Sequence, residues 1–168
     1  MTNATTAAAK ARRAVLVGLG AIALAVLVVL GARLSDGPVG FLPGGSLRSG
    51  EWVDAPVADW SFAKDVAEVE LALEGERSSR TTWILVDGGQ AWIPCSLSFP
   101  PFKRWHERAA ADGRAVLRID GRRYPVTLVR EDFRPTRRRL ELVAHEKYEN
   151  LPPTDGGVWL FRVESRAR

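Results

Sequence analysis

The chain contains very little cysteine and histidine, and this scarcity excludes several kinds of chemistry. Its 168 residues include one cysteine, Cys95, so neither an intramolecular disulfide nor a cysteine-based zinc site can form. The two histidines, His106 and His145, have no histidine or cysteine three or four residues away, and we predict no metal site. The G-x-S-x-G pattern of a hydrolase nucleophile is also missing. The sequence therefore assigns no catalytic residue.

Charge of one sign is not concentrated in this chain either. Twenty-four basic residues face 20 acidic ones, which leaves a formal net charge of +4. Nucleic-acid binding normally needs a concentrated basic stripe. We therefore expect no nucleic-acid partner.

One long hydrophobic run lies near the N-terminus. Residues from Ala14 to Leu30 are uncharged and apolar, and the run is first interrupted at Arg33. This length just suffices to cross the hydrocarbon layer, whereas the apolar centre of a cleaved signal peptide is shorter. We predict a tail over residues 1–13 and a single-pass transmembrane helix over residues 14–34. A cleaved signal and a buried soluble helix are the alternatives.

The charges around this run predict its orientation in the cell membrane. Lys10, Arg12 and Arg13 precede it without an acidic residue among them, which favours a cytoplasmic N-terminus. Arg33 and Arg48 on the far side oppose this assignment. We expect the folded domain outside the cell.

Glycine, proline and serine dominate the next stretch, residues 35–50. Such a composition is typical of a flexible tether with turns. We predict that the folded domain covers residues 51–168, which leaves room for one small hydrophobic core.

The domain contains patterns of several short strands joined by tight turns. Val69, Leu71 and Leu73 alternate with more polar residues, as expected of a half-buried strand. Asp120-Gly121 is a strong hairpin signal, because both turn positions tolerate positive φ. The strands predicted from such patterns cover residues 66–73, 81–86, 90–95, 114–119, 122–130 and 156–166.

Two helices are predicted between these strands. The first covers residues 102–112, after a proline pair, and the second covers residues 136–149, where Leu140, Val143, Ala144 and Tyr148 form an apolar stripe. Short strands with hairpin links, and too few helices to cover a parallel sheet, favour a small, mainly antiparallel barrel. The predicted fold class is mainly β with two helices, preceded by the transmembrane helix.

The run from Asp59 to Asp132 carries a family resemblance. Its pattern of "DG", "P", "S", "W" and "DGR", from "TTWILVDGGQAWIPCSLSFPPFKRW" to "RIDGRR", resembles the flavin-binding split-barrel superfamily, whose fold is that of pyridoxamine-phosphate oxidase. Within it, the deazaflavin-dependent nitroreductase-like branch and its membrane-anchored relatives look most similar. The resemblance implies a split barrel, FMN or a deazaflavin coenzyme, a redox reaction and a homodimer.

The same resemblance implies where a cofactor phosphate would lie. It places hydroxyl, basic and aromatic side chains around the second and third strands and at the start of the following helix. These properties suit a phosphate and an aromatic ring. The positions that match in this chain are Thr81, Thr82, Ser96, Lys103, Arg104 and Trp105.

Two departures from the family pattern keep a second hypothesis open. Arg108 stands where the nitroreductase-like branch often has asparagine, and the phosphate loop is reduced to "EGERSSRTTW". The first hypothesis is a membrane-anchored flavin- or deazaflavin-dependent oxidoreductase. The alternative is a non-enzymatic, membrane-tethered barrel that acts as a binding or assembly module without cofactor. Cys95 is more simply explained as a small apolar side chain than as a redox thiol.

Overall fold

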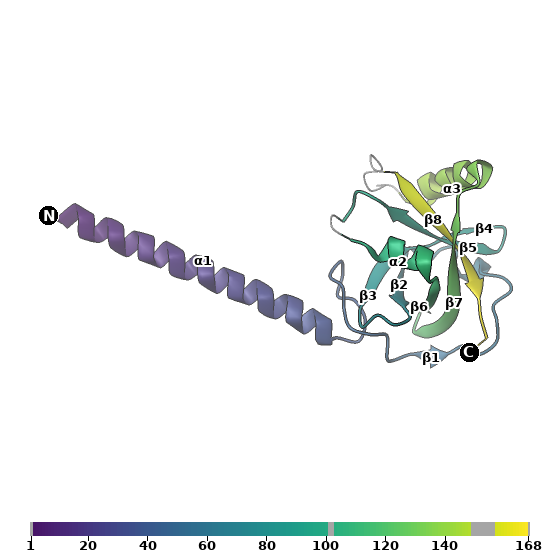
Figure 1. The fold of residues 1–168 in the computed structure, drawn as a ribbon, viewed down its shortest axis with the longest axis horizontal. Helices are drawn as coiled ribbons and strands as arrows, with labels where there is room; N and C mark the ends of the chain where they lie inside the picture. The colour runs from purple at the N-terminus through teal and green to yellow at the C-terminus, as the bar shows by residue number, and fades with distance from the viewer. Residues whose placement is uncertain (1, 101–102, 149–156, 168) are drawn as a thin grey trace.

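The computed structural model describes residues 2–100, 103–148 and 157–167, and it shows a long helix joined to a curled sheet (Figure 1). Helix α1, Thr2–Leu34, runs away from the rest of the molecule. Its apolar part, Val15–Leu34, is 20 residues long and almost entirely exposed. A helix of this kind fits a membrane anchor or a signal sequence.

Eight strands form one sheet that curls into a half-barrel. The hydrogen-bonded order is β3-β2-β6-β7-β8-β5-β4, and the short β1 pairs with β7 in parallel. Every other pairing is antiparallel. The strands are β1 Glu51–Trp52, β2 Glu68–Leu73, β3 Ser79–Trp83, β4 Leu85–Asp87, β5 Gln90–Ser96, β6 Arg114–Ile119, β7 Arg122–Glu131 and β8 Val158–Ser165.

Two tight hairpin turns contain glycine, and the one predicted at Asp120-Gly121 is confirmed. Asp120 and Gly121 have φ of 47° and 75° and join β6 to β7 in register, with Ile119 opposite Arg122. Gly88 and Gly89 have φ of 57° and 78° and join β4 to β5. Positive φ at both central positions gives such a turn the twist of the strands that it connects.

The prediction of one continuous strand over residues 81–86 is wrong. The buried Ile84 interrupts this run: the residues before it end β3, and the residues after it begin β4. These two strands lie at opposite ends of the strand order. The Ile84 carbonyl leaves the ladder and accepts hydrogen bonds from Lys147 Nζ at 2.8 Å and Tyr148 Oη at 3.0 Å. One apolar run therefore supplies both ends of the half-barrel.

Two further α-helices and one 3₁₀ turn cover the sheet. Helix α2, Trp105–Ala111, is shorter than predicted, and α3, Arg134–Lys147, begins two residues earlier than predicted. Turn η1 covers Ser61–Ala63. The predicted ends at residues 102 and 149 lie outside the described residues. On α3, Leu140 is fully buried and Val143, Ala144 and Tyr148 pack beside it, as predicted.

Residues 35–50, which we call the connecting segment, lie against the sheet. Gly44 and Ser79 exchange backbone hydrogen bonds of 3.0 and 3.2 Å along the free edge of β3. The buried Ser79 hydroxyl donates to the Gly45 carbonyl at 2.5 Å, and Leu47 is buried. The composition predicted a flexible tether, whereas the fold attaches this segment to β3. The division between segment and domain at residue 51 stays a prediction.

Candidate functional site

The six residues predicted to hold a cofactor lie on neighbouring parts of the half-barrel. Thr81 and Thr82 are on β3, and Ser96 is the last residue of β5. Lys103 and Arg104 precede α2, and Trp105 is its first residue. Their cofactor role stays a prediction. Their geometry decides which of them can act together.

Thr81 and Thr82 face opposite sides of the sheet, because successive strand residues alternate. Thr82 is paired with Val69, a core residue, and Thr81 is paired with Glu70 on the other face. The Thr81 hydroxyl donates to the Gly40 carbonyl of the connecting segment at 2.8 Å. Of the two threonines, only Thr82 shares a face with the core.

Ser96 shapes the turn that leads from β5 to α2. Its hydroxyl accepts a hydrogen bond from the Phe99 backbone N–H at 3.2 Å and lies 3.2 Å from the Ser98 hydroxyl. The side chain is buried at the end of the strand. Ser96 thus stabilises the turn that positions the residues after it.

The two basic residues before α2 have different surroundings. Lys103 Nζ donates to the carbonyls of Phe99 at 2.5 Å and Pro100 at 3.4 Å. Burial lowers the pKa of Lys103. Arg104 is largely exposed and donates from Nε to Glu107 at 2.9 Å. Lys103 therefore points back over the turn, whereas Arg104 points to solvent.

Trp105 packs into the core instead of standing on the surface. It is 7% exposed, and its ring centroid lies 5.7 Å from that of Phe161. Trp92, on β5, is also buried and is 4% exposed. Neither ring offers an open face to a ligand within one copy of the chain.

Arg80 is a residue of this site that the sequence analysis missed. Its guanidinium lies 5.5 Å from the centre of the Trp105 ring and 2.5 Å from a Glu76 carboxylate oxygen. Arg108 Nε approaches the other Glu76 oxygen at 2.7 Å, without the alignment of a hydrogen bond. Burial lowers the pKa of Arg80, and the nearby Glu76 acts in the opposite direction. The sequence could have indicated Arg80 through strand alternation, because a residue two positions before Thr82 lies on the same face of the strand.

Cys95 lies near both Arg80 and Lys103, and it is 3% exposed. Burial raises its pKa to about 12, although the nearby charges of Lys103 and Arg80 act in the opposite direction. The thiol is therefore protonated at neutral pH and fills space as an apolar side chain. We call the group formed by Arg80, Cys95, Ser96, Lys103 and Trp105 the α2 corner.

A second aromatic layer borders the α2 corner. His106 is 9% exposed and lies edge-on to the Trp159 ring at 5.0 Å between centroids, while the Arg130 guanidinium lies 3.7 Å from that ring's centre. Burial lowers the pKa of His106, so the imidazole is neutral at physiological pH. Among the residues that the structure describes, its Nδ1 has no hydrogen-bond partner.

The α2 corner fits one part of a flavin better than the other. Arg80, Lys103 and the nearby Arg108 supply guanidinium and ammonium donors, which are the groups that bind phosphate. The ring system of a flavin needs an apolar wall, and Trp92 and Trp105 are both buried. The donor set therefore fits a phosphate group, and a ring wall would have to come from a second copy or from a movement of these side chains.

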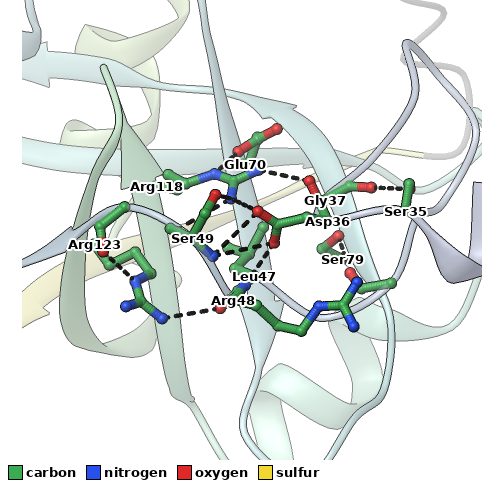
Figure 2. A network of polar contacts seen from close by, with 12 residues as sticks. Ser35, Asp36, Gly37, Leu47, Arg48, Ser49, Glu70, Ser79, Arg118 and Arg123 are labelled. Carbon is green, nitrogen blue, oxygen red and sulfur yellow. Dashed lines mark hydrogen bonds and ion pairs between the residues drawn. The ribbon is translucent and has the colours of Figure 1, made fainter.

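A polar network lies on the opposite face of the sheet, beside the connecting segment (Figure 2). Asp36 accepts from the backbone N–H groups of Arg48 at 2.6 Å and Ser49 at 3.1 Å, and from Arg118 Nη1 at 3.1 Å. Arg118 Nε donates to Glu70. Hydrogen bonding, first from Ser49, outweighs burial and holds the pKa of Asp36 well below its usual range. We call these five residues the Arg118 network.

A polar groove of about 570 Å³ lies elsewhere, between η1, the β4–β5 turn and α3. Its charged lining residues are Asp59, Lys64, Asp87 and Glu146. The Asp59 carboxylate accepts from the Ser61 backbone N–H at 2.8 Å, and Asp87 pairs with Arg139. Within the part of the chain that the structure describes, none of the six predicted cofactor residues lines this groove.

Two solved structures are similar to this chain. One is a candidate pyridoxamine 5′-phosphate oxidase from Listeria innocua, with 12% identity and a TM-score of 0.46 over 62% of this chain and 88% of that one. Another is a NimC/NimA family protein from Clostridium acetobutylicum, with 18% identity and a TM-score of 0.45 over 62% of this chain and 75% of that one. At such TM-scores and identities the similarity assigns no cofactor, substrate or activity. No protein-family model and no curated protein matches the chain.

Proposed function

We propose that this chain is a membrane-anchored split-barrel protein whose α2 corner binds the phosphate of a flavin or deazaflavin, and that it acts as an oxidoreductase. The observation that carries the proposal is the incompletely compensated basic cluster. Arg80, Lys103 and Arg108 gather there, and the only acid paired with Arg80 and Arg108 in the described structure is Glu76. A bound flavin would supply hydride or electron transfer.

Membrane anchoring is supported by the apolar part of α1. Twenty residues in a helix span about 30 Å, which is the thickness of the hydrocarbon layer. Leu16, Leu24 and Leu27 are each about 60% exposed, and such surface is stable when lipid covers it. With Lys10, Arg12 and Arg13 before the span, the N-terminus lies in the cytoplasm and the half-barrel outside.

A homodimer would complete the flavin site. One copy offers phosphate donors but no exposed aromatic wall, because Trp92 and Trp105 are in its core. Sedimentation of the full chain in detergent, with and without cofactor, tests this part. A monomer that binds flavin would contradict it.

The central experiment measures cofactor retention by the full chain in detergent. We expect FMN or a deazaflavin coenzyme to shift the visible absorption spectrum and to raise the melting temperature. Lys103→Ala should weaken that binding about tenfold, since it removes one charge-assisted phosphate contact. Arg122→Ala, at the exposed start of β7, is the matched control and should leave binding unchanged. Absence of binding by both cofactors would rule out the redox proposal.

A specific observation favours the non-enzymatic alternative, a tethered binding or assembly module. Donors assigned to the cofactor already have partners within the chain: Lys103 donates to two carbonyls, Thr81 to Gly40, and Arg80 to Glu76. Phosphate would have to replace some of these contacts. If neither cofactor binds, this alternative becomes the better hypothesis.

The side of the membrane also bears on the redox proposal, because a domain outside the cell would need its cofactor exported. Protease treatment of intact cells tests the orientation. We expect cleavage of the half-barrel without disruption of the membrane. Protection of the half-barrel would reverse the assigned orientation and place it beside the cytoplasmic flavin supply.

A further inference from the structure

The connecting segment contains a small hairpin with an apolar tip. Val39 and Leu42 exchange backbone hydrogen bonds of 3.1 and 3.0 Å across a turn formed by Gly40 and Phe41. Gly40 has a φ of +58°, which a turn of this kind favours. Phe41 is 93% exposed, and Val39 is 51% exposed. We call residues 38–43 the Phe41 hairpin.

The Phe41 hairpin is attached to the sheet at its tip and at its base. Thr81 donates to the Gly40 carbonyl at 2.8 Å, and Gly44 is paired with Ser79 on the edge of β3. The base is so tightly packed that a Cβ placed on Gly44 would lie 1.7 Å from the Gly37 carbonyl oxygen. The exposure of Phe41 is therefore a feature of an ordered hairpin.

The base of the hairpin lies immediately beyond the end of α1. Ser35 closes α1 by donating its hydroxyl to the Ala32 carbonyl at 2.6 Å, and Arg48 Nη2 donates to the Leu34 carbonyl at 3.2 Å. Asp36, two residues after Leu34, already contacts Arg118 on the sheet. Two residues span at most about 7 Å, which is similar to the depth of one polar headgroup layer.

We propose that the Phe41 hairpin is a second membrane contact, in which Phe41 and Val39 enter the interfacial layer of the bilayer that α1 spans. This inference rests on the proposed membrane anchoring. Aromatic and apolar side chains are favoured at this depth when the bilayer is close. Two arginines would meet lipid phosphates there: Arg33 in the last turn of α1, and Arg48, whose side chain contacts the end of that helix.

Together with the Arg118 network, this contact would fix the half-barrel on the bilayer. One membrane helix alone leaves a domain free to rotate and tilt. A hairpin held by Thr81 and Ser79, with its tip in lipid, turns the β2–β3 face toward the membrane. The α2 corner would then lie on the other face of the sheet, because its β3 residue, Arg80, and Thr81 point to opposite sides of that strand.

Site-specific labelling tests this proposal in the full chain. Cys95 is buried and has a raised pKa, so a thiol label should react mainly with an introduced cysteine. Phe41→Cys, Leu24→Cys and Phe133→Cys would each carry an environment-sensitive fluorophore in vesicles of phosphatidylcholine and phosphatidylglycerol. Wild type gives the background from Cys95. Quenchers attached near the headgroup or deep in the acyl chain then report the depth of each label.

The three labels separate the inference from the anchoring on which it rests. We expect headgroup-level quenchers to act on Phe41→Cys at least about threefold more strongly than on Phe133→Cys, an exposed phenylalanine beside α3. Deep quenchers should act on Leu24→Cys. Deep quenching at Leu24 with none at Phe41 would overturn the hairpin contact alone. No quenching at Leu24 would overturn the anchoring.

Discussion

Two arginines, Arg118 and Arg80, are largely covered on opposite sides of the sheet, and their surroundings differ. Arg118, 11% exposed, contacts Glu70 and Asp36, which lie 48 and 82 residues away in sequence. Arg80, 14% exposed, contacts Glu76, four residues away. Hydrogen bonding to Glu70 raises the pKa of Arg118, whereas burial lowers that of Arg80.

The difference teaches what each arginine is suited to do. Arg118 joins the connecting segment to two strands, so its charge is balanced by contacts that hold the fold together. Arg80 shares its one acid with Arg108, so its cluster keeps an excess of positive charge. A buried cation without full compensation is costly unless a further anion binds. We therefore expect the Arg118 network to have a structural role, and the α2 corner stays our proposed ligand site.

The largest effect should come from removing Arg118. Arg118→Ala leaves the carboxylates of Asp36 and Glu70 without their shared donor, and we expect a loss of about 2 to 4 kcal/mol in the free energy of unfolding. Denaturant unfolding measures this loss, and hydrogen exchange should increase in residues 36–49. Arg104→Ala, which removes an exposed ion pair, should change stability by less than about 0.5 kcal/mol. Equal effects of the two variants would contradict the comparison.

A smaller effect should follow from neutralising Glu76. Glu76→Gln removes the carboxylate that compensates Arg80, and we expect a loss of about 1 to 3 kcal/mol. Inorganic phosphate should recover part of the melting temperature, because it can replace the missing charge. Glu70→Gln is the control, since Arg118 retains Asp36. The assignment of a ligand site to the α2 corner fails if phosphate stabilises both variants equally.

The Arg118 network also predicts a pH dependence at its acidic end. The folded pKa of Asp36 is depressed from its ordinary value of 3.8, so the unfolded state binds the proton more readily. The contribution of ionised Asp36 to the free energy of unfolding is fully present at a pH above its ordinary pKa. This contribution is lost as the pH falls toward the folded pKa. Acid titration of unfolding should therefore show a steeper loss in wild type than in Asp36→Asn. Identical slopes would show that Asp36 contributes nothing at low pH.

The smallest effect should come from Cys95. Cys95→Ala removes one buried sulfur atom, and we expect the free energy of unfolding to fall by about 1 kcal/mol. The proposed flavin binding should not change. Because its pKa is raised to about 12, the native thiol should react slowly with thiol reagents at neutral pH and rapidly after denaturation. Fast native reaction, or lost flavin binding in Cys95→Ala, would give Cys95 a role at the site.

Much of the secondary structure could be predicted because its causes are local. The Asp120-Gly121 turn needs only two residues that tolerate positive φ, and the apolar stripe on α3 follows helical spacing. The break at Ile84 could not be predicted, because an apolar run does not reveal that its halves join different ends of a curled sheet. Neither could the contacts of the connecting segment, whose glycines and prolines are equally typical of a tether.

The candidate site was predicted only in part for the same reason. Ser96, Lys103 and Trp105 lie along the turn into α2 because they are close in sequence, whereas the proximity of Arg80 depends on how β3 packs against that turn. Composition and periodicity are enough to establish an apolar N-terminal helix and a mainly β domain, since both follow from spacing along the chain. Which arginine is balanced and which keeps excess charge is decided by tertiary structure, because the partners of Arg118 approach it only when the chain folds.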